Sequence, residues 1–432
     1  MSDSSGHRLT TLPSGVRVVT EAVPGVRSAA LGFFIATGSV TEPAEQAGWS
    51  HLLEHLLFRG TPRYGSAEID ELFDGMGAEL NAGTGRESTS VYSRVLDQHL
   101  ERAFDVMADM VWRPAITAPD VASEQEIVLE ELAMYEDDPQ DRVFDLLGEA
   151  TFGDHPLGRA VIGTRATVTA AAAGPLHTFH DERYVPGDVV VAAAGSVDHD
   201  ALVALVERQE TGPAGAHAPA PPPPPDTTVA PRRRFIEKPT EQVHLTLGAP
   251  GIARDDERRY ALRVLDTILG GTSSSRLFQE VREKRALAYS VSTFHAQYAG
   301  AGHVGLYLGT RPENLRTAMQ VVGEELERFQ QDGITADELA RAKENAKGRA
   351  VLTLESTSAR MSRLGGALLA GLPILSLDDL IARVEAVTAD DVVVLARELL
   401  APERLSAAAV GPSESEFRAA LEPVMPALAA TA

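Results

Sequence analysis

Two histidines and a glutamate lie close together near residue 50. The stretch 49–58 reads WSHLLEHLLF and has the apolar spacing of a helix. His51 and His55 are four positions apart, so their imidazoles would project from one helix face about a turn apart, as two ligands of one metal ion require. Glu54 would lie at the edge of that face, where it could accept a proton from a metal-bound water. The pattern therefore predicts a hydrolytic metal site.

Zinc suits this arrangement. The chain has no cysteine, so any metal site must use His, Asp or Glu. A catalytic zinc ion has three protein ligands and a position for water, whose pKa it lowers from 15.7 to about 7. Five neighbouring apolar residues would keep the site dry: Leu52, Leu53, Leu56, Leu57 and Phe58. The motif alone also fits two helix histidines beside a salt-bridging glutamate, so the hypothesis needs a third ligand.

The acidic stretch 119–136 offers candidates for that ligand. It reads PDVASEQEIVLEELAMYE and is predicted to be a helix. Glu124 and Glu131 are seven positions apart and share a face, whereas Glu130 points about 100° away from Glu131 and Glu126 also lies off that face. Most acidic helix faces are simply solvated. Spacing alone does not choose between Glu124 and Glu131.

A proline-rich segment divides the 432-residue chain near its midpoint. Residues 211–231 include five consecutive prolines, Pro221 to Pro225, which favour extended polyproline II and exclude helix or central strand. We expect residues 1–210 and 232–432 to form two domains joined by this linker, rather than one domain with a long loop.

The two halves follow one plan. Strand-like and alternating stretches separate long helical patterns in each half, and the order of elements aligns Thr61 with Thr272 and Thr117 with Thr335. This order predicts an α+β fold with two homologous domains, each a mostly antiparallel sheet covered by helices. The helices expected in the first half are 43–58, 66–76, 97–112 and 119–136.

The motif His51-x-x-Glu54-His55, followed 76 positions later by Glu131, resembles the pitrilysin/insulinase family of zinc peptidases, the inverzincins. The chain looks most like the half-length branch that includes mitochondrial processing peptidase and its bacterial relatives. The resemblance covers essentially the whole chain. It continues through four further stretches in the same order: 77–82, 86–89, 271–278 and 281–291.

The resemblance implies roles for the residues around the first motif. His51, His55 and Glu131 would bind one Zn²⁺ per chain, and Glu54 would be the general base. Glu124 would be an acidic residue behind the ligands that steadies them.

It also implies how a substrate is held. Asn81 and Ala82 would lie on an edge strand to which an extended peptide adds its own backbone hydrogen bonds. Arg282 and Tyr289 would donate hydrogen bonds to the scissile carbonyl as it becomes an oxyanion. Outside the family context these two residues fit a surface helix arginine and a half-buried strand tyrosine.

The second half departs from the first at the metal-binding positions. Aligning the two copies places Leu262–Asp266 opposite the histidine motif, and Ala342 and Arg349 opposite Glu124 and Glu131. We therefore expect zinc in the first domain only.

The expected activity is zinc-dependent endoproteolysis of peptides or short unfolded polypeptides. In the family, two half-length chains enclose a chamber. This chain has both the zinc ligands and the Arg/Tyr pair, which favours a homodimer. The alternatives are a subunit of a heteromeric processing peptidase and a non-catalytic scaffold.

Net charge and the N-terminus bear on partners and location. With 39 Lys and Arg against 62 Asp and Glu, the net charge is −23, so nucleic acid and anionic membranes are not expected partners. Neither a signal-peptide pattern nor an apolar run of about 18–20 residues is evident, and a cytoplasmic location is expected.

Overall fold

The computed structural model describes residues 6–209, 211–228 and 230–430. Residue 210, the end of the first predicted domain, residue 229 of the predicted linker and both chain ends lie outside this range. Contacts divide the chain into two units. The first unit contains residues up to Leu132, Ala160–Pro222 and Val351–Leu377. The second contains the remaining stretches, Ala133–Arg159, Pro223–Ala350 and the residues from Asp378 on.

Each unit thus takes residues from both halves of the chain. The division into homologous domains at residues 1–210 and 232–432, joined by a linker at 211–231, stays a prediction.

In the described residues of the first unit, six strands form one sheet in the order β1-β2-β6-β3-β5-β4. Neighbouring strands are antiparallel except β2 and β6, which are parallel. The central strands β3 and β6 have the continuous apolar sequences SAALGFFI and VVVAAAG. Such runs suit the centre of the sheet, because both faces of these strands are covered. The strands are β1 (Arg8–Thr11), β2 (Arg17–Ala22), β3 (Ser28–Ile35), β4 (Glu79–Thr84), β5 (Thr89–Leu96) and β6 (Val189–Gly195).

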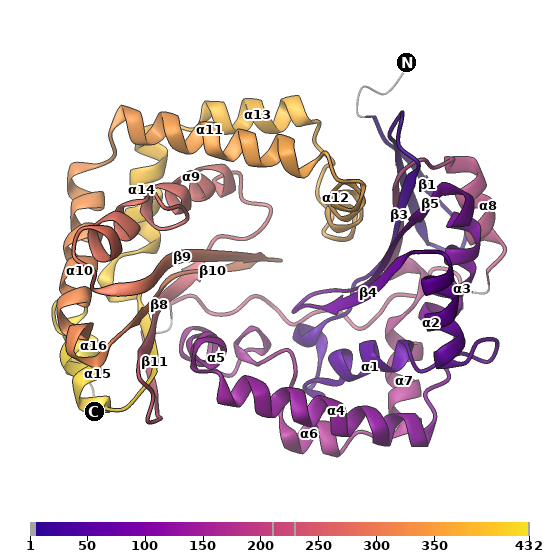
Figure 1. Ribbon diagram of the computed structural model, residues 1–432, viewed down its shortest axis with the longest axis horizontal. Coiled ribbons are helices and arrows are strands. Elements are labelled where there is room, and N and C mark those ends of the chain that lie inside the picture. Colours follow the sequence, from indigo (N-terminus) through magenta and orange to yellow (C-terminus); the bar gives the residue numbers. More distant parts are fainter. Residues whose placement is uncertain (1–5, 210, 229, 431–432) are drawn as a thin grey trace. The chain divides into compact units, whose positions relative to one another are not determined.

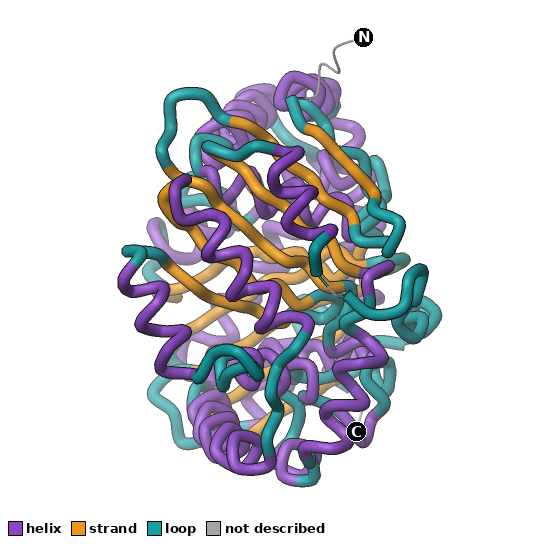
Figure 2. Tube along the Cα trace, turned by 90° about the vertical axis from the view of Figure 1, so that its right-hand side faces the viewer, coloured by secondary structure: helices purple, strands orange, loops and turns teal. Residues whose placement is uncertain are grey.

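Helices cover both faces of this sheet. One face packs on the large core around α1 and α3, while α12 lies on the other (Figure 1). Met361 and Leu364 of α12 are buried in one apolar cluster with Phe34 of β3. In the view of Figure 2 helices lie in front of the strands of this sheet. The helices are α1 (Trp49–Leu57), α2 (Ser66–Gly75), α3 (Leu100–Trp112), α4 (Ala118–Asp137, up to Leu132 in this unit), α6 (Arg165–Thr169), α7 (Ala173–Arg183), α8 (His199–Glu207) and α12 (Thr357–Leu369).

The second unit repeats the plan with five described strands in the order β7-β11-β8-β10-β9. Its one parallel pair, β7 with β11, occupies the position of β2 with β6. The strands are β7 (Arg233–Glu237), β8 (Val243–Gly251), β9 (Ala288–Tyr298), β10 (Ala301–Thr310) and β11 (Ser406–Gly411).

Helix α5, which comes from the first half of the chain, packs on this second sheet. Val143 and Leu147 of α5 are buried against Tyr307 and Ala408 of the sheet. The helices are α5 (Pro139–Phe152), α9 (Arg259–Leu269), α10 (Leu315–Asp332), α11 (Ala336–Thr353, up to Ala350 in this unit), α13 (Leu377–Ala386, from Asp378 in this unit), α14 (Ala389–Leu399), α15 (Glu414–Leu421) and α16 (Pro426–Ala429), with a π-helical turn at Phe278–Glu283.

The predicted fold class is confirmed: the fold is α+β, with two mostly antiparallel sheets covered by helices. The predicted helix 43–58 is wrong in its first part. Two short 3₁₀ turns, Ser39–Thr41 and Ala44–Gln46, precede a helix that begins only at Trp49. Gly48 interrupts the helix because its φ of 90° is left-handed.

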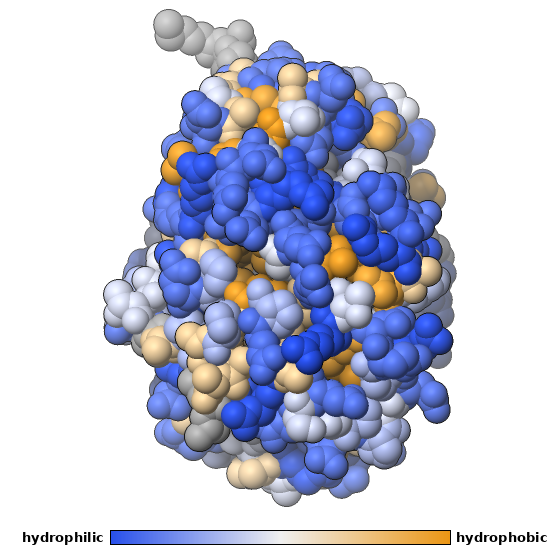
Figure 3. Space-filling view, turned by 90° about the vertical axis from the view of Figure 1, so that its left-hand side faces the viewer, coloured by the Kyte–Doolittle hydropathy of each residue, from blue (hydrophilic) through white to orange (hydrophobic). Residues whose placement is uncertain are grey.

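Figure 3 shows one face that is mostly hydrophilic, with apolar side chains in separate patches. Over the described part of the chain, no helix has the length and apolarity needed to cross a membrane.

Candidate metal centre

Helix α1 holds the histidine motif rigidly. Its four leucines, at positions 52, 53, 56 and 57, are fully buried in the first core. The helix ends at the C-cap Phe58, whose N–H donates to the carbonyl of His55, and the N–H of Arg59 donates to the carbonyl of Leu56. With one face fixed in this way, the polar residues of the motif lie on the opposite, half-buried side.

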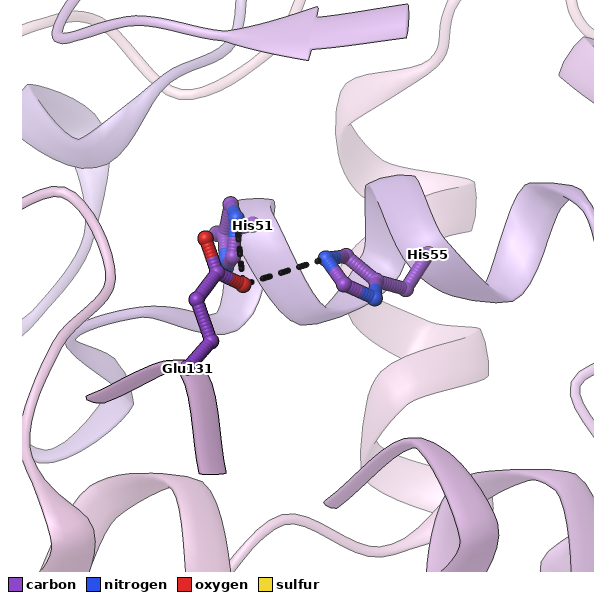
Figure 4. Close-up of side chains that lie close together, drawn as sticks. All are labelled: His51, His55 and Glu131. Atoms are coloured by element: carbon purple, nitrogen blue, oxygen red, sulfur yellow. Dashed lines mark ion pairs between the residues drawn. The ribbon is translucent and has the colours of Figure 1, made fainter. Parts of the chain in front are cut away.

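The structure brings His51, His55 and Glu131 together (Figure 4). Glu131 of α4 points between the two imidazoles of α1, and its Oε2 atom lies 3.7 Å from the Nε2 atom of each histidine. The three ligand atoms lie within 4.8 Å of one another. Ligands of a tetrahedral zinc ion, with bonds of about 2.0–2.1 Å, lie about 3.3–3.4 Å apart. Small side-chain movements would therefore close this group around zinc.

The donor set fits zinc chemically as well as geometrically. Burial, assisted by the nearby His55, lowers the pKa of His51 to about 4, so this imidazole is neutral at pH 7 and has a lone pair available. The Nδ1 atom of His55 lies 2.9 Å from Oε2 of Glu124. A proton held there leaves the Nε2 atom free to face the group.

Glu124 is the buried support of His55. Its side chain is only 5% exposed, and it also accepts a hydrogen bond from Nε of Arg59. Burial alone would raise the pKa of Glu124, but the hydrogen bonds from His55 and Arg59 outweigh it and lower the pKa. Burial would likewise lower the pKa of His55, but the bond and charge of Glu124, with Glu131 and Glu54, raise it. The structure thus separates two glutamates that spacing could not.

Glu54 lies beside the group without belonging to it. Burial raises the pKa of its carboxyl group, and hydrogen bonds from Thr84 of β4 partly oppose this. Its Oε2 atom is buried and lacks a hydrogen-bond partner among the described residues. A free carboxylate oxygen beside a metal group can accept a proton from water.

The predicted peptide-binding residues lie on β4, the edge strand of the first sheet. Asn81 is exposed and Ala82 half-buried, packed against the core. The N–H of Ala82 donates to Oδ1 of Asn81 at 2.8 Å. A peptide that used this N–H would have to displace the asparagine amide.

Arg282 and Tyr289 lie together in the second unit. The guanidinium carbon of Arg282 is 4.8 Å from the ring centre of Tyr289 and 4.7 Å from that of Phe278. The Tyr289 side chain is 76% exposed, so its hydroxyl is open to solvent. On α9 and α11 of the same unit, Leu262 and Ala342 are buried apolar residues.

Two supporting residues were not predicted for the site. Arg59 follows His55 by four positions, a spacing that puts it on the same helical side, and this could have indicated a partner for a glutamate. Thr84 lies five positions before Thr89 on a paired strand, and no pattern in the sequence connects it with Glu54.

The sequence is similar to those of known proteins over nearly its full length. Residues 17–165 match the family model described as Insulinase (Peptidase family M16), and residues 173–346 match that described as Peptidase M16 inactive domain. An "uncharacterized zinc protease" of Streptomyces coelicolor is 45% identical over 412 residues, covering 94% of this chain and 89% of that protein. Another in Mycobacterium tuberculosis is 44% identical, covering 95% and 94%. YmxG of Bacillus subtilis, with the same description, is 40% identical, covering 93% and 98%.

Solved structures share the fold. A protein described as a peptidase M16 inactive domain from Pseudomonas fluorescens superposes with a TM-score of 0.85 at 24% identity, covering 94% of this chain and 98% of that one. A protease from Helicobacter pylori gives a TM-score of 0.89 at 21% identity, covering 94% and 99%.

Proposed function

Because this chain belongs to the insulinase family of peptidases (family M16), we propose that it is a zinc-dependent metalloendopeptidase. Its substrates would be peptides or short unfolded polypeptides, cleaved in a closed chamber. The observation that carries the proposal is the group formed by His51, His55 and Glu131, with the free carboxylate oxygen of Glu54 beside it. A scaffold relative would have no need to retain both the ligands and the base.

Each residue has a defined task. Zinc, when bound by His51, His55 and Glu131, would supply a Lewis acid that polarises the scissile carbonyl and makes water more acidic. Glu54 would take the proton of the attacking water and pass it to the leaving amine. Glu124 would hold His55 through its Nδ1 atom, so that Nε2 keeps its direction.

The remaining residues would hold the substrate. The open edge of β4 at Asn81 and Ala82 suits an extended peptide, because it offers backbone groups that a strand can pair with. Arg282 and Tyr289 have donors suited to a developing oxyanion. The family pattern favours a homodimer, with a heterodimer as the alternative. It also favours one zinc ion per chain.

Metal analysis and peptide digestion test the proposal together. We expect about one zinc per purified chain, and cleavage of unstructured peptides, detected by mass spectrometry, that stops on chelation and returns with added zinc. Folded protein that contains no zinc and cleaves nothing would support the scaffold alternative. Activity that appears only after adding a second protein would support the heteromeric one.

A further inference from the structure

The N-terminus of α1 is capped by a residue from outside the helix. The first N–H groups of any helix lack partners within it and need an acceptor. Glu42 lies six residues upstream of the N-cap Gly48, and each of its two carboxylate oxygens accepts a hydrogen bond from one of these N–H groups. Oε2 accepts the N–H of Gly48 at 2.8 Å, and Oε1 accepts the N–H of Ser50 at 2.7 Å. The residue is only 3% exposed, so these bonds are shielded from water.

The packing around Gly48 explains why the cap comes from a distance. A Cβ atom at this position would lie 2.4 Å from the carbonyl oxygen of Ile162 and 2.8 Å from Cα of Gly163. The φ of 90° is a second obstacle to any side chain there. Ser, Thr, Asp and Asn, the usual N-cap residues, are therefore excluded from position 48. Glu42 does what a local cap cannot.

Charge favours a carboxylate at this point. The helix N-terminus carries a partial positive charge, which an anion stabilises. Arg183, itself 5% exposed, interacts electrostatically with Glu42. The Arg183 guanidinium lies 3.9 Å from the ring centre of Phe179, and that ring packs edge-on, at 5.9 Å, against Trp49, the first residue of α1. Both charge and packing thus fix the first turn.

We propose that Glu42 is a positioning residue for the metal centre. It bonds to Ser50, which immediately precedes His51, so it sets the backbone of the turn from which the first ligand projects. His51 needs this support more than His55, whose ring Glu124 holds directly. Loss of the cap would let the first turn loosen and move His51 away from Glu131. The proposal rests on the zinc-dependent function proposed above.

Zinc affinity separates positioning from general stability. Glu42→Gln keeps the size of the side chain but removes its charge and one of its two acceptors. We expect it to raise the zinc dissociation constant about tenfold, as other supporting residues of metal sites do. The assay is competition with a chromophoric chelator on the purified full-length chain, beside thermal unfolding of the zinc-free protein.

Asp198→Ala is the matched control. Asp198 caps α8 in the same unit through the N–H of Ala201 at 2.8 Å, and it has no part in the metal centre. This variant should lower the thermal midpoint but leave the zinc dissociation constant within about twofold of wild type. Equal zinc weakening in the control and in Glu42→Gln would overturn the positioning role.

Glu42→Asp is a second variant in case Glu42→Gln does not fold. Asp keeps the charge but is one methylene too short to reach both N–H groups. The zinc affinity of Glu42→Asp should therefore lie between that of the wild type and that of Glu42→Gln. Wild-type affinity in every Glu42 variant that folds overturns the proposal. Wild-type protein that binds no zinc overturns the proposed function instead, which keeps the two failures distinct.

Discussion

Three of the glutamates of α4, Glu124, Glu130 and Glu131, should differ sharply in their effect on zinc binding. Glu131→Gln removes one of the three proposed ligands, and we expect the zinc dissociation constant to rise at least about 100-fold, or about 2.8 kcal/mol. Glu124→Gln leaves an amide with one acceptor facing two donors, His55 and Arg59. Leaving one buried donor unpaired costs about 1–3 kcal/mol, or about 5- to 140-fold, and loss of a residue that supports a metal ligand typically weakens binding about 10- to 100-fold. Glu130 is exposed, and Glu130→Gln should stay within about twofold.

Competition between the zinc-free variants and a chelator of known affinity would measure these differences, with circular dichroism to check the fold. Glu130→Gln is the internal control, because it makes the same chemical change one residue from the ligand. Equal losses for Glu130→Gln and Glu131→Gln would mean that the face of α4 assigned to the metal is wrong. A larger loss for Glu124→Gln than for Glu131→Gln would exchange their roles.

Three further expectations follow from the geometry and from the family pattern. Glu54→Gln should retain zinc but lose hydrolysis by about 10³-fold, because an amide cannot accept the proton, and an active variant would remove Glu54 from the mechanism. Glu338 of α11 accepts hydrogen bonds from Arg276, and these lower the pKa of Glu338 to about 2. This shift corresponds to about 3 kcal/mol of folding stability, which is present above about pH 4.5 and is lost as the pH falls towards 2. Glu338→Gln should therefore lower the urea-measured free energy of unfolding by about 2–3 kcal/mol at pH 7 and by much less near pH 3; an equal difference at both would contradict this. In the proposed homodimer, by analogy with the family, Arg282 and Tyr289 of one chain would serve the zinc site of the other. Co-expressing His55→Ala with Arg282→Ala/Tyr289→Phe should then restore about a quarter of wild-type activity, since half the dimers would be mixed and each would have one whole site of two. No recovery in demonstrated mixed dimers would refute complementation between chains.

The sequence predicted that His51 and His55 lie side by side, as the structure shows, because a helix fixes the relation between positions 51 and 55. It could not separate Glu124 from Glu131, since both share a face and differ only in which atom of the neighbouring helix each meets. That distinction depends on how α4 packs against α1, and it becomes visible only in the 2.9 Å contact between Glu124 and His55. Helix periodicity also did not reveal the late start of α1, because the packing of residue 163 against Gly48 is a long-range contact.

The sequence also did not predict that one helix from each half of the chain packs on the sheet formed by the other half. Helix α5 has an apolar face, but the sequence does not say which sheet that face meets. It packs on the sheet of the second unit, while α12 packs on that of the first. Gly365 of α12 lies so near Phe34 that a Cβ atom would be 2.2 Å from its ring. Such close packing is specified by shape, which periodicity does not encode.

The fold by itself cannot distinguish a peptidase from a scaffold in this family. The order of the five described strands of the second sheet matches β2-β6-β3-β5-β4 of the first, with the parallel pair at the same place. Yet α1 has His51 and His55 where the aligned α9 has Leu262 and Asp266. The superpositions at TM-scores of 0.85 and 0.89 therefore show architecture only. What argues for catalysis is a few side chains whose distances suit a metal and whose supports are buried. For that reason, substitutions at Glu131 and Glu54 test the function more directly than any comparison of backbones.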